Sequence, residues 1–153
     1  MMKVRLLSFI IFCFISLNAI AAEFVSLRSS EVNMRAGPSK NYPIKWIYKR
    51  KSLPLKVLAT IDDWKKVKDI KGASGWVHKS VVSTARYALV VNVDYVVMYK
   101  YPSEDSKKLL RLERMVQVRV KQCDKDWCQV KVNKFLGWVP KKNLWGDTSG
   151  LSG

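Results

Sequence analysis

Cysteine and histidine are the residues of this chain that could supply a nucleophile and a base. Cys123 and Cys128 lie close together near the C-terminal end, whereas the single histidine, His78, lies well upstream. A thiol hydrolase needs its cysteine beside a histidine that a third group orients. His78 and Cys128 fall in different halves of the chain, so we assign no catalytic residues.

Carboxylate pairs could support a second chemistry, the cleavage of glycosides, if a pocket raised the pKa of one member. The candidates are the neighbours Asp62 and Asp63 and the pair Asp124 and Asp126. Both pairs lie in short polar segments between apolar runs, which is typical of exposed turns. We therefore expect a protein that is not an enzyme and that uses no cofactor.

Residues 1–22 have the pattern of a secretory signal peptide. Lys3 and Arg5 give a positive start, an apolar run covers residues 6–17, and Ala19-Ile20-Ala21 supplies a small-residue cleavage pattern. The alternative is an uncleaved membrane anchor, but the run is short for a membrane-spanning helix. We predict a mature protein that is periplasmic or secreted and that lacks a transmembrane segment.

Cleavage would leave Cys123 and Cys128 as the two remaining cysteines, and an even number in an oxidising compartment predicts a disulfide. They flank the polar residues 124–127 between two strand-like runs, so the bridge would join the arms of a hairpin. The alternatives are a thiol nucleophile and a metal site, and two thiols without nearby histidines are a poor zinc site. We predict the disulfide and no metal.

Aromatic side chains alternate with cations, a combination that suits stacking on sugar rings and binding of carboxylates or phosphates. Trp64 and Trp127 lie an odd number of residues from Val67 and Val130, so they do not share the expected core face. Packing beneath a loop is the alternative for both tryptophans. The groove candidates are Arg35, Tyr42, Trp46, Tyr48 and Trp64 in the first half, and Tyr99, Tyr101, Trp127 and Pro140 in the second.

The formal net charge is +16, and removal of Lys3 and Arg5 with the leader would leave +14. Such an excess favours anionic partners such as peptidoglycan, other acidic envelope polymers and lipid headgroups. Export argues against nucleic acid as a partner. The alternative is a basic exterior without a specific partner, because net charge governs solubility and non-specific binding.

The chain repeats itself. Met34 matches Met98 at an offset of 64 residues, and Trp76 matches Trp138 at an offset of 62. A drift of two residues predicts small loop changes between two copies of one module.

Each copy is rich in strand signals. Val116, Val118 and Val120 alternate with polar residues, which is typical of a half-buried strand. Several short strands within about sixty residues predict a small barrel or sandwich. We predict an all-β protein composed of a signal peptide (1–22), a first module (23–87), a second module (88–146) and a flexible tail (147–153).

Three segments of the first repeat carry a family resemblance: Val32-Asn33-Met34-Arg35-Ala36-Gly37-Pro38-Ser39, Trp64-Lys65-Lys66-Val67 and Gly75-Trp76-Val77. Together they resemble a bacterial SH3-like (SH3b) domain. With Asp126-Trp127-Cys128 and Leu144-Trp145-Gly146, the chain also resembles a two-repeat exported protein family of alphaproteobacteria. The resemblance implies two tandem SH3-like small β-barrels.

The resemblance also bears on function. Relatives of this domain often accompany cell-wall enzymes and are thought to recognise peptidoglycan or peptides. It therefore implies a non-catalytic binding module for peptidoglycan or another anionic envelope component. The alternative is an adaptor that binds a peptide of an envelope protein. In eukaryotic relatives, the tryptophan that corresponds to Trp64 and Trp127 lies in the peptide groove. Leu144 stands here in place of the second aromatic residue of that groove. Asn33 and Arg35 match the family motif, and we expect them to form turn and backbone hydrogen bonds.

Overall fold

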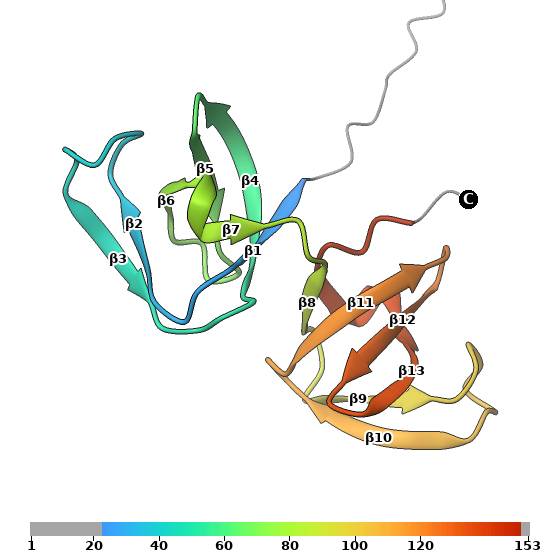
Figure 1. Cartoon of the computed structure of the whole chain (residues 1–153). Coiled ribbons are helices and arrows are strands. Elements are labelled where there is room, and N and C mark those ends of the chain that lie inside the picture. The colour runs from blue at the N-terminus through green and yellow to red at the C-terminus, as the bar shows by residue number, and fades with distance from the viewer. Residues whose placement is uncertain (1–22, 151–153) are drawn as a thin grey trace, which may run out of the picture.

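The computed structural model describes residues 23–150, which form two small β-barrels side by side (Figure 1). The predicted signal peptide lies outside the described residues. Within them, no helix is long and apolar enough to cross a membrane.

The first barrel contains β1 (Phe24–Leu27), β2 (Val32–Arg35), β3 (Ile44–Tyr48), β4 (Pro54–Ile61), β5 (Trp64–Lys68), β6 (Ser74–His78), the 3-10 turn η1 (Lys79–Val81) and β7 (Val82–Ser83). The second contains β8 (Tyr87–Val90), β9 (Tyr95–Tyr99), β10 (Lys108–Glu113), β11 (Gln117–Cys123), β12 (Trp127–Val132), β13 (Phe135–Pro140), the 3-10 turn η2 (Lys141–Asn143) and β14 (Leu144–Gly146).

The two barrels share one strand order. The first sheet runs β3-β2-β6-β5-β4-β1-β7, and the second runs β10-β9-β13-β12-β11-β8-β14. Each strand of the first barrel therefore has a counterpart seven strands later, and the pairings in both barrels are antiparallel. The prediction of an all-β protein with two tandem SH3-like barrels is confirmed.

A separate hydrophobic core fills each barrel, and in strands such as β2, β6, β9 and β12 alternate residues point into it. In β12, for example, Cys128 and Val130 are fully buried while Lys131 is exposed. The first core gathers Val25, Leu27, Val32, Met34, Tyr48, Leu55, Val67, Val77 and Val82. The second gathers Ala88, Val90, Val96, Met98, Leu112, Val118, Val120, Cys123, Cys128, Val130, Val139 and Leu144.

The glycine of the repeated Gly-Trp-Val motif is required by close packing. A Cβ on Gly75 would lie 2.7 Å from Cγ of Met34, and a Cβ on Gly137 would lie 2.5 Å from Cγ of Met98. Each would also lie 2.7 Å from a backbone carbonyl oxygen. Real Cβ atoms do not approach neighbours this closely, so only glycine lets the two strands pack across the core methionine.

The predicted disulfide between Cys123 and Cys128 is present and joins β11 to β12 across directly paired positions. The equivalent pair in the first barrel is Thr60 and Lys65. There the Lys65 ammonium instead forms an ion pair with Glu23 at 2.9 Å. One barrel therefore closes this hairpin covalently and the other closes it with side-chain contacts.

The barrels contact each other through both side chains and backbone. The rings of Phe24 and Trp145 pack edge to face with centroids 5.2 Å apart. The Arg50 guanidinium donates to the Met115 carbonyl at 3.0 Å, and the Gln117 amide donates to the Lys51 carbonyl at 3.3 Å. These contacts link β1 and the β3–β4 connection of one barrel to β14 and the start of β11 in the other.

The first residues of the tail, which the sequence predicts to be flexible, contact the connection between the barrels. The Asp147 amide donates to the Tyr87 carbonyl at 3.1 Å, and the Asp147 carboxylate lies 3.4 Å from the Arg86 guanidinium. Arg86 also donates to the Ser149 carbonyl. The connection between the barrels therefore holds the start of the tail, and residues 151–153 lie outside the described part of the chain.

Candidate binding grooves

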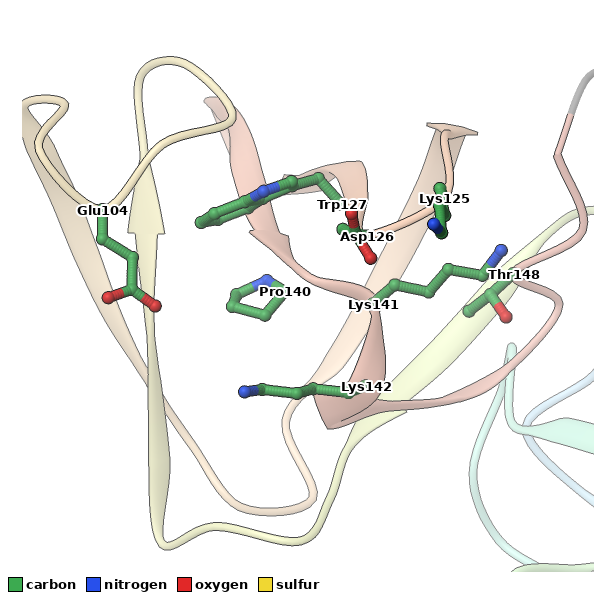
Figure 2. Close-up of a pocket in the computed structure, with 8 residues that line it drawn as sticks. All are labelled: Glu104, Lys125, Asp126, Trp127, Pro140, Lys141, Lys142 and Thr148. Carbon is green, nitrogen blue, oxygen red and sulfur yellow. The ribbon is translucent and has the colours of Figure 1, made fainter.

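Each barrel has an open hollow, and the two hollows lie at equivalent places in the fold. Four features line both: the tryptophan that opens β5 or β12, the last residue of β6 or β13, the loop after β2 or β9, and the 3-10 turn. The first hollow, of about 290 Å³, is lined by Glu31, Val32, Asn33, Arg35, Lys40, Trp64, His78, Ser80 and Val81. The second, of about 600 Å³, is lined by Glu104, Lys125, Asp126, Trp127, Pro140, Lys141, Lys142 and Thr148 (Figure 2).

Strand register places the two tryptophans in these grooves. Trp64 lies directly opposite His78, and Trp127 lies directly opposite Pro140. Directly opposed residues of an antiparallel pair share one face of the sheet. Both tryptophans are half-buried, so their rings form part of a wall and still reach solvent.

The first groove contains a histidine held by its neighbours. The rings of Trp64 and His78 pack edge to face with centroids 5.2 Å apart. Nδ1 of His78 accepts a hydrogen bond from the Ser80 amide at 3.3 Å, and the Ser80 hydroxyl oxygen lies 2.8 Å from the same nitrogen. Nε2 lies 3.9 Å from the Asp63 carboxylate. A hydrogen bond from Lys79, at 2.8 Å, holds the pKa of Asp63 below its ordinary value.

This arrangement is not a serine–histidine–aspartate triad. The Ser80 amide already occupies the Nδ1 lone pair that would accept the serine proton. The 3.9 Å separation between Nε2 and Asp63 is too long for a hydrogen bond that orients the ring. The Asp63 carboxylate is instead held by Lys79, so the cluster shapes the wall of the groove.

Arg35 fixes the loop that forms the other wall of the first groove. Its guanidinium donates to the carbonyls of Tyr42 at 2.8 Å and Lys40 at 3.1 Å. Gly37 lets the Tyr42 ring lie against the backbone, because a Cβ there would lie 2.5 Å from that ring. The expectation that Arg35 forms backbone hydrogen bonds is confirmed.

The second groove is larger and brings three lysines, Lys125, Lys141 and Lys142, close to Trp127. Tyr99 and Trp127 pack edge to face with ring centroids 5.8 Å apart. Figure 2 shows the Trp127 ring over Pro140, with Lys142 extending beneath toward Glu104. The Lys141 ammonium donates to the Asp124 carbonyl at 3.3 Å, which ties the 3-10 turn to the tip of the disulfide-closed hairpin.

The other predicted groove residues lie elsewhere. Tyr48 is only 5% exposed and its hydroxyl donates to the Asp69 carboxylate at 3.1 Å, yet together with Trp46 it lines a further hollow of about 190 Å³, apart from the two grooves. Trp46 is 53% exposed and lies on β3, away from Trp64. Tyr42 belongs to the loop after β2, where its ring lies against Gly37 and its carbonyl accepts from Arg35, and Tyr101 is 60% exposed outside the second hollow. Tyr48 is the one buried residue of β3 and lies directly opposite the buried Val32.

Sequence reasoning missed the groove residues that follow the Gly-Trp-Val motif. His78 and Ser80 in the first module, and Lys141 and Lys142 in the second, come directly after that motif. The available signal was position: they occupy the same interval after matching tryptophans. Glu104 and Lys125 belong to loops and carry no such signal.

The side chains of the described residues also bear on metal binding and on thiol chemistry. Residues 23–150 contain no group of three or more histidine, cysteine, aspartate or glutamate side chains that could hold a metal ion. Cys123 and Cys128 are joined to each other. What the grooves offer is therefore aromatic faces beside ammonium, guanidinium and carboxylate groups.

The profile of the bacterial SH3 domain family matches residues 28–84 and, a second time, residues 92–146. The chain belongs to the bacterial SH3 domain family. Each match covers one barrel apart from its first strand, β1 or β8, and includes the residues that line the groove of that barrel except Thr148.

Comparison with solved structures found seven similar chains, and the three described here have low sequence identity. NlpC1 from Trichomonas vaginalis is 13% identical with a TM-score of 0.38, and 90% of this chain covers 50% of that one. NlpC2 from the same organism is 11% identical with a TM-score of 0.37, and 86% of this chain covers 51% of that one. An NlpC/P60 family protein from Bacillus cereus ATCC 10987 is 13% identical with a TM-score of 0.36, and 80% of this chain covers 56% of that one. The chain thus spans about half the length of these proteins. No curated protein matches significantly.

Proposed function

We propose that this protein is a non-catalytic binding protein of the cell envelope whose two grooves recognise peptidoglycan. The observation that carries the proposal is the placement of a solvent-reaching tryptophan in a hollow at the same position of both bacterial SH3 domains. Two modules with diverged loops keep this arrangement, which is what a shared binding role requires. The predicted export would place the protein where peptidoglycan is found.

The chemistry of the grooves fits a glycan that carries peptides. Flat aromatic faces such as Trp64 and Trp127 suit stacking against sugar rings. Cations at the rims, Lys40 in the first groove and Lys142 in the second, suit the carboxylates of stem peptides. Binding in such a groove depends on packing as well as charge, so it should persist in salt.

A binding role also fits the placement of the reactive side chains. His78 lies in the first barrel, and the nearest candidate nucleophile, Ser80, donates its amide to the histidine ring. The cysteines lie in the second barrel and are joined in a disulfide. Degradation of sacculi by the pure protein would contradict this part of the proposal.

A second candidate is an adaptor that binds a peptide segment of an envelope protein. The observation that favours it is the aromatic slot of the second groove, where Tyr99 packs edge to face on Trp127 beside Pro140. An extended peptide could lay apolar side chains in this slot while lysines at its rim hold acidic ones.

Co-sedimentation of the chain lacking residues 1–22 with purified sacculi, at low and high salt, tests the proposal. We expect binding that survives high salt and that falls about tenfold in Trp64→Ala/Trp127→Ala, since buried aromatic anchors dominate such contacts. Trp46→Ala is the matched control, because Trp46 is exposed outside both grooves. Circular dichroism in the near ultraviolet verifies that each variant is folded, and Trp→Phe versions serve if an alanine variant is not.

Two results would contradict recognition of peptidoglycan. Absence of salt-resistant binding would exclude it, and crosslinked capture of one reproducible envelope protein that depends on Tyr99 and Trp127 would then support the adaptor. An equal loss in the Trp46→Ala variant would show that the grooves are not the binding surface.

A further inference from the structure

The outer face of the first barrel carries a compact set of cations, which we call the basic face: Lys45, Lys56, Lys66 and Lys68. Lys66 and Lys68 lie on β5, two residues apart and both exposed, and so share one face of that strand. Lys68 lies directly opposite Lys56 on β4 and directly opposite Ser74 on β6. The Lys45 ammonium reaches across from β3 to the Ser74 carbonyl at 2.9 Å.

The spacing of these cations follows from the sheet. Directly opposed side chains such as Lys56 and Lys68 have Cβ atoms about 5 Å apart. Lys66 and Lys68 are separated by about 7 Å along their strand. The cations therefore form a row across neighbouring strands with a branch along β5, and Trp76, directly opposite Lys66, lies half-buried among them.

No acidic side chain within residues 23–87 faces this row. Glu23 pairs with Lys65, Glu31 with Lys49 and Asp63 with Lys79, while Asp69 is buried against Tyr48. Asp62 lies in the β4–β5 turn at positive φ. None of the four cations of the basic face belongs to an ion pair with another described residue.

Like charges placed directly opposite each other destabilise a sheet. The second barrel nevertheless repeats the arrangement, since Arg119 lies directly opposite Lys131 at the positions equivalent to Lys56 and Lys68. Leu109 and Gln129 stand at the positions equivalent to Lys45 and Lys66. The facing cations thus recur in both barrels, and only the first builds the full row around them.

We propose that the basic face binds a linear polymer that carries phosphate groups. Two lysines whose Cβ atoms lie about 5 Å apart on adjacent strands can direct both ammonium groups at the free oxygens of one phosphate. Lys66 and Lys45 then meet the neighbouring groups of the polymer on either side. Bound phosphates would also relieve the repulsion between Lys56 and Lys68. None of the four cations lines either groove, although Lys66 shares its face of β5 with Trp64, and the ligand proposed here differs from the glycan proposed for the grooves.

A polymer fits this face better than a bilayer does. Docking to a bilayer relies on apolar side chains that protrude beside the cations. Here the aromatic residue between the cations is Trp76, which is half-buried and offers a flat surface. The protruding apolar side chains border the row: Ile44, Trp46 and Ile47 flank Lys45 on the edge strand β3, and Leu58 follows Lys56 on β4, whereas none stands between the paired Lys56 and Lys68 or between Lys66 and Lys68.

The test uses long-chain inorganic polyphosphate as the probe and measures affinity over a series of salt concentrations. Lys56→Gln/Lys68→Gln is compared with Arg28→Gln/Lys51→Gln, which removes the same charge from exposed loop positions of the same barrel. We expect the first variant to lose about tenfold in affinity and about 1.4 in the slope of log K against log salt. The control should stay near the parent protein in both.

A single charge reversal keeps the proposal testable if the double variant is affected in folding. Lys68→Glu places opposite charges across β4 and β5, so we expect an unchanged or higher melting temperature together with a loss of polyphosphate binding. A loss of binding accompanied by a lower melting temperature would count as a folding defect and would overturn this expectation.

Three outcomes would overturn the proposal. Equal losses in both double variants would show attraction by net charge alone. Equal or tighter binding per anionic group to vesicles of phosphatidylglycerol would assign the face to a bilayer. Equal or tighter binding per anionic group to polygalacturonate would assign it to polymers that carry carboxylates. The grooves are tested independently, because Trp64→Ala/Trp127→Ala should retain polyphosphate binding and Lys56→Gln/Lys68→Gln should retain salt-resistant binding to sacculi.

Discussion

At the residue scale, the two barrels differ most in the pair formed by Tyr48 and Asp69. The Asp69 carboxylate accepts hydrogen bonds from the Tyr48 hydroxyl at 3.1 Å and from the Ala73 amide at 2.9 Å. Burial, reinforced by the charge of Asp69, raises the pKa of Tyr48 far above its ordinary value. Leu112 and Val132 stand at the equivalent positions of the second barrel, so only the first barrel carries a titrating group in its core.

We predict that Tyr48→Phe lowers the free energy of unfolding by about 1–3 kcal/mol near pH 8, because a buried carboxylate loses a partner. The raised pKa means that the tyrosine hydroxyl stabilises the folded state at pH values below about 10, the ordinary value, and that this contribution is lost as the pH rises above it. Denaturant unfolding at pH 8 and pH 11 should therefore show the difference between variant and parent shrinking. A difference equal at both pH values would contradict the prediction, and Tyr101→Phe, at an exposed site, is the control.

Single residues also show what the sequence could predict. Trp64 and Trp127 were placed off the core face from their odd spacing to Val67 and Val130, and the structure agrees. The burial of Tyr48 could not be predicted, because it depends on Val32 lying directly opposite it on β2. The register between strands depends on residues that are far apart in the chain, so a single sequence predicts it only weakly.

At the element scale, the two β-hairpins that present the groove tryptophans are closed differently. The disulfide joins the arms of β11 and β12, and Trp127 precedes Cys128. In the first barrel, Lys65 makes only exposed side-chain contacts at the equivalent place. The disulfide was predictable from the number of cysteines and the expected compartment. The need for glycine in the Gly-Trp-Val motif was not predictable, because it depends on the close approach of Met34 or Met98.

We predict that Cys123→Ala/Cys128→Ala lowers the free energy of unfolding of the second barrel by about 2 kcal/mol, the chain-entropy value for so short a loop. The same change should follow reduction of the parent protein by a thiol reagent. Denaturant unfolding monitored by hydrogen exchange of each barrel measures it. An unchanged free energy of unfolding in both the variant and the reduced parent protein would contradict the prediction.

At the scale of the whole molecule, the barrels support each other. A module of about sixty residues buries only about 60% of its unfolded surface, which makes it marginal alone. Leu89 is fully buried although it belongs to neither core cluster. It lies between the core residues Ala88 and Val90 on β8, so its side chain is on the opposite face of that strand. It pairs directly with Trp145, whose ring packs on Phe24 of the other barrel. The sequence predicted both modules but not this contact, because nothing in a repeat indicates which surfaces meet.

We predict that Phe24 and Trp145 are energetically coupled by about 0.5–1.5 kcal/mol, the value of an edge-to-face aromatic pair. A double-mutant cycle with Phe24→Leu and Trp145→Leu measures this coupling. Calorimetry should also show the single unfolding transition of the parent protein separating into two in Trp145→Leu, since the barrels then melt independently. Additive effects and one unchanged transition would contradict the prediction.

The direct contacts between the barrels have a consequence for avidity. Phe24 with Trp145, and Arg50 with the Met115 carbonyl, link the two domains without a long flexible tether. The second groove is therefore presented at a restricted distance and direction once the first is filled. Binding in one groove raises the effective concentration of the ligand at the other groove only if the repeat of the ligand matches that separation. A stiff polymer of the right period would be held far more tightly than its isolated repeat unit, so the protein would measure spacing as well as chemistry.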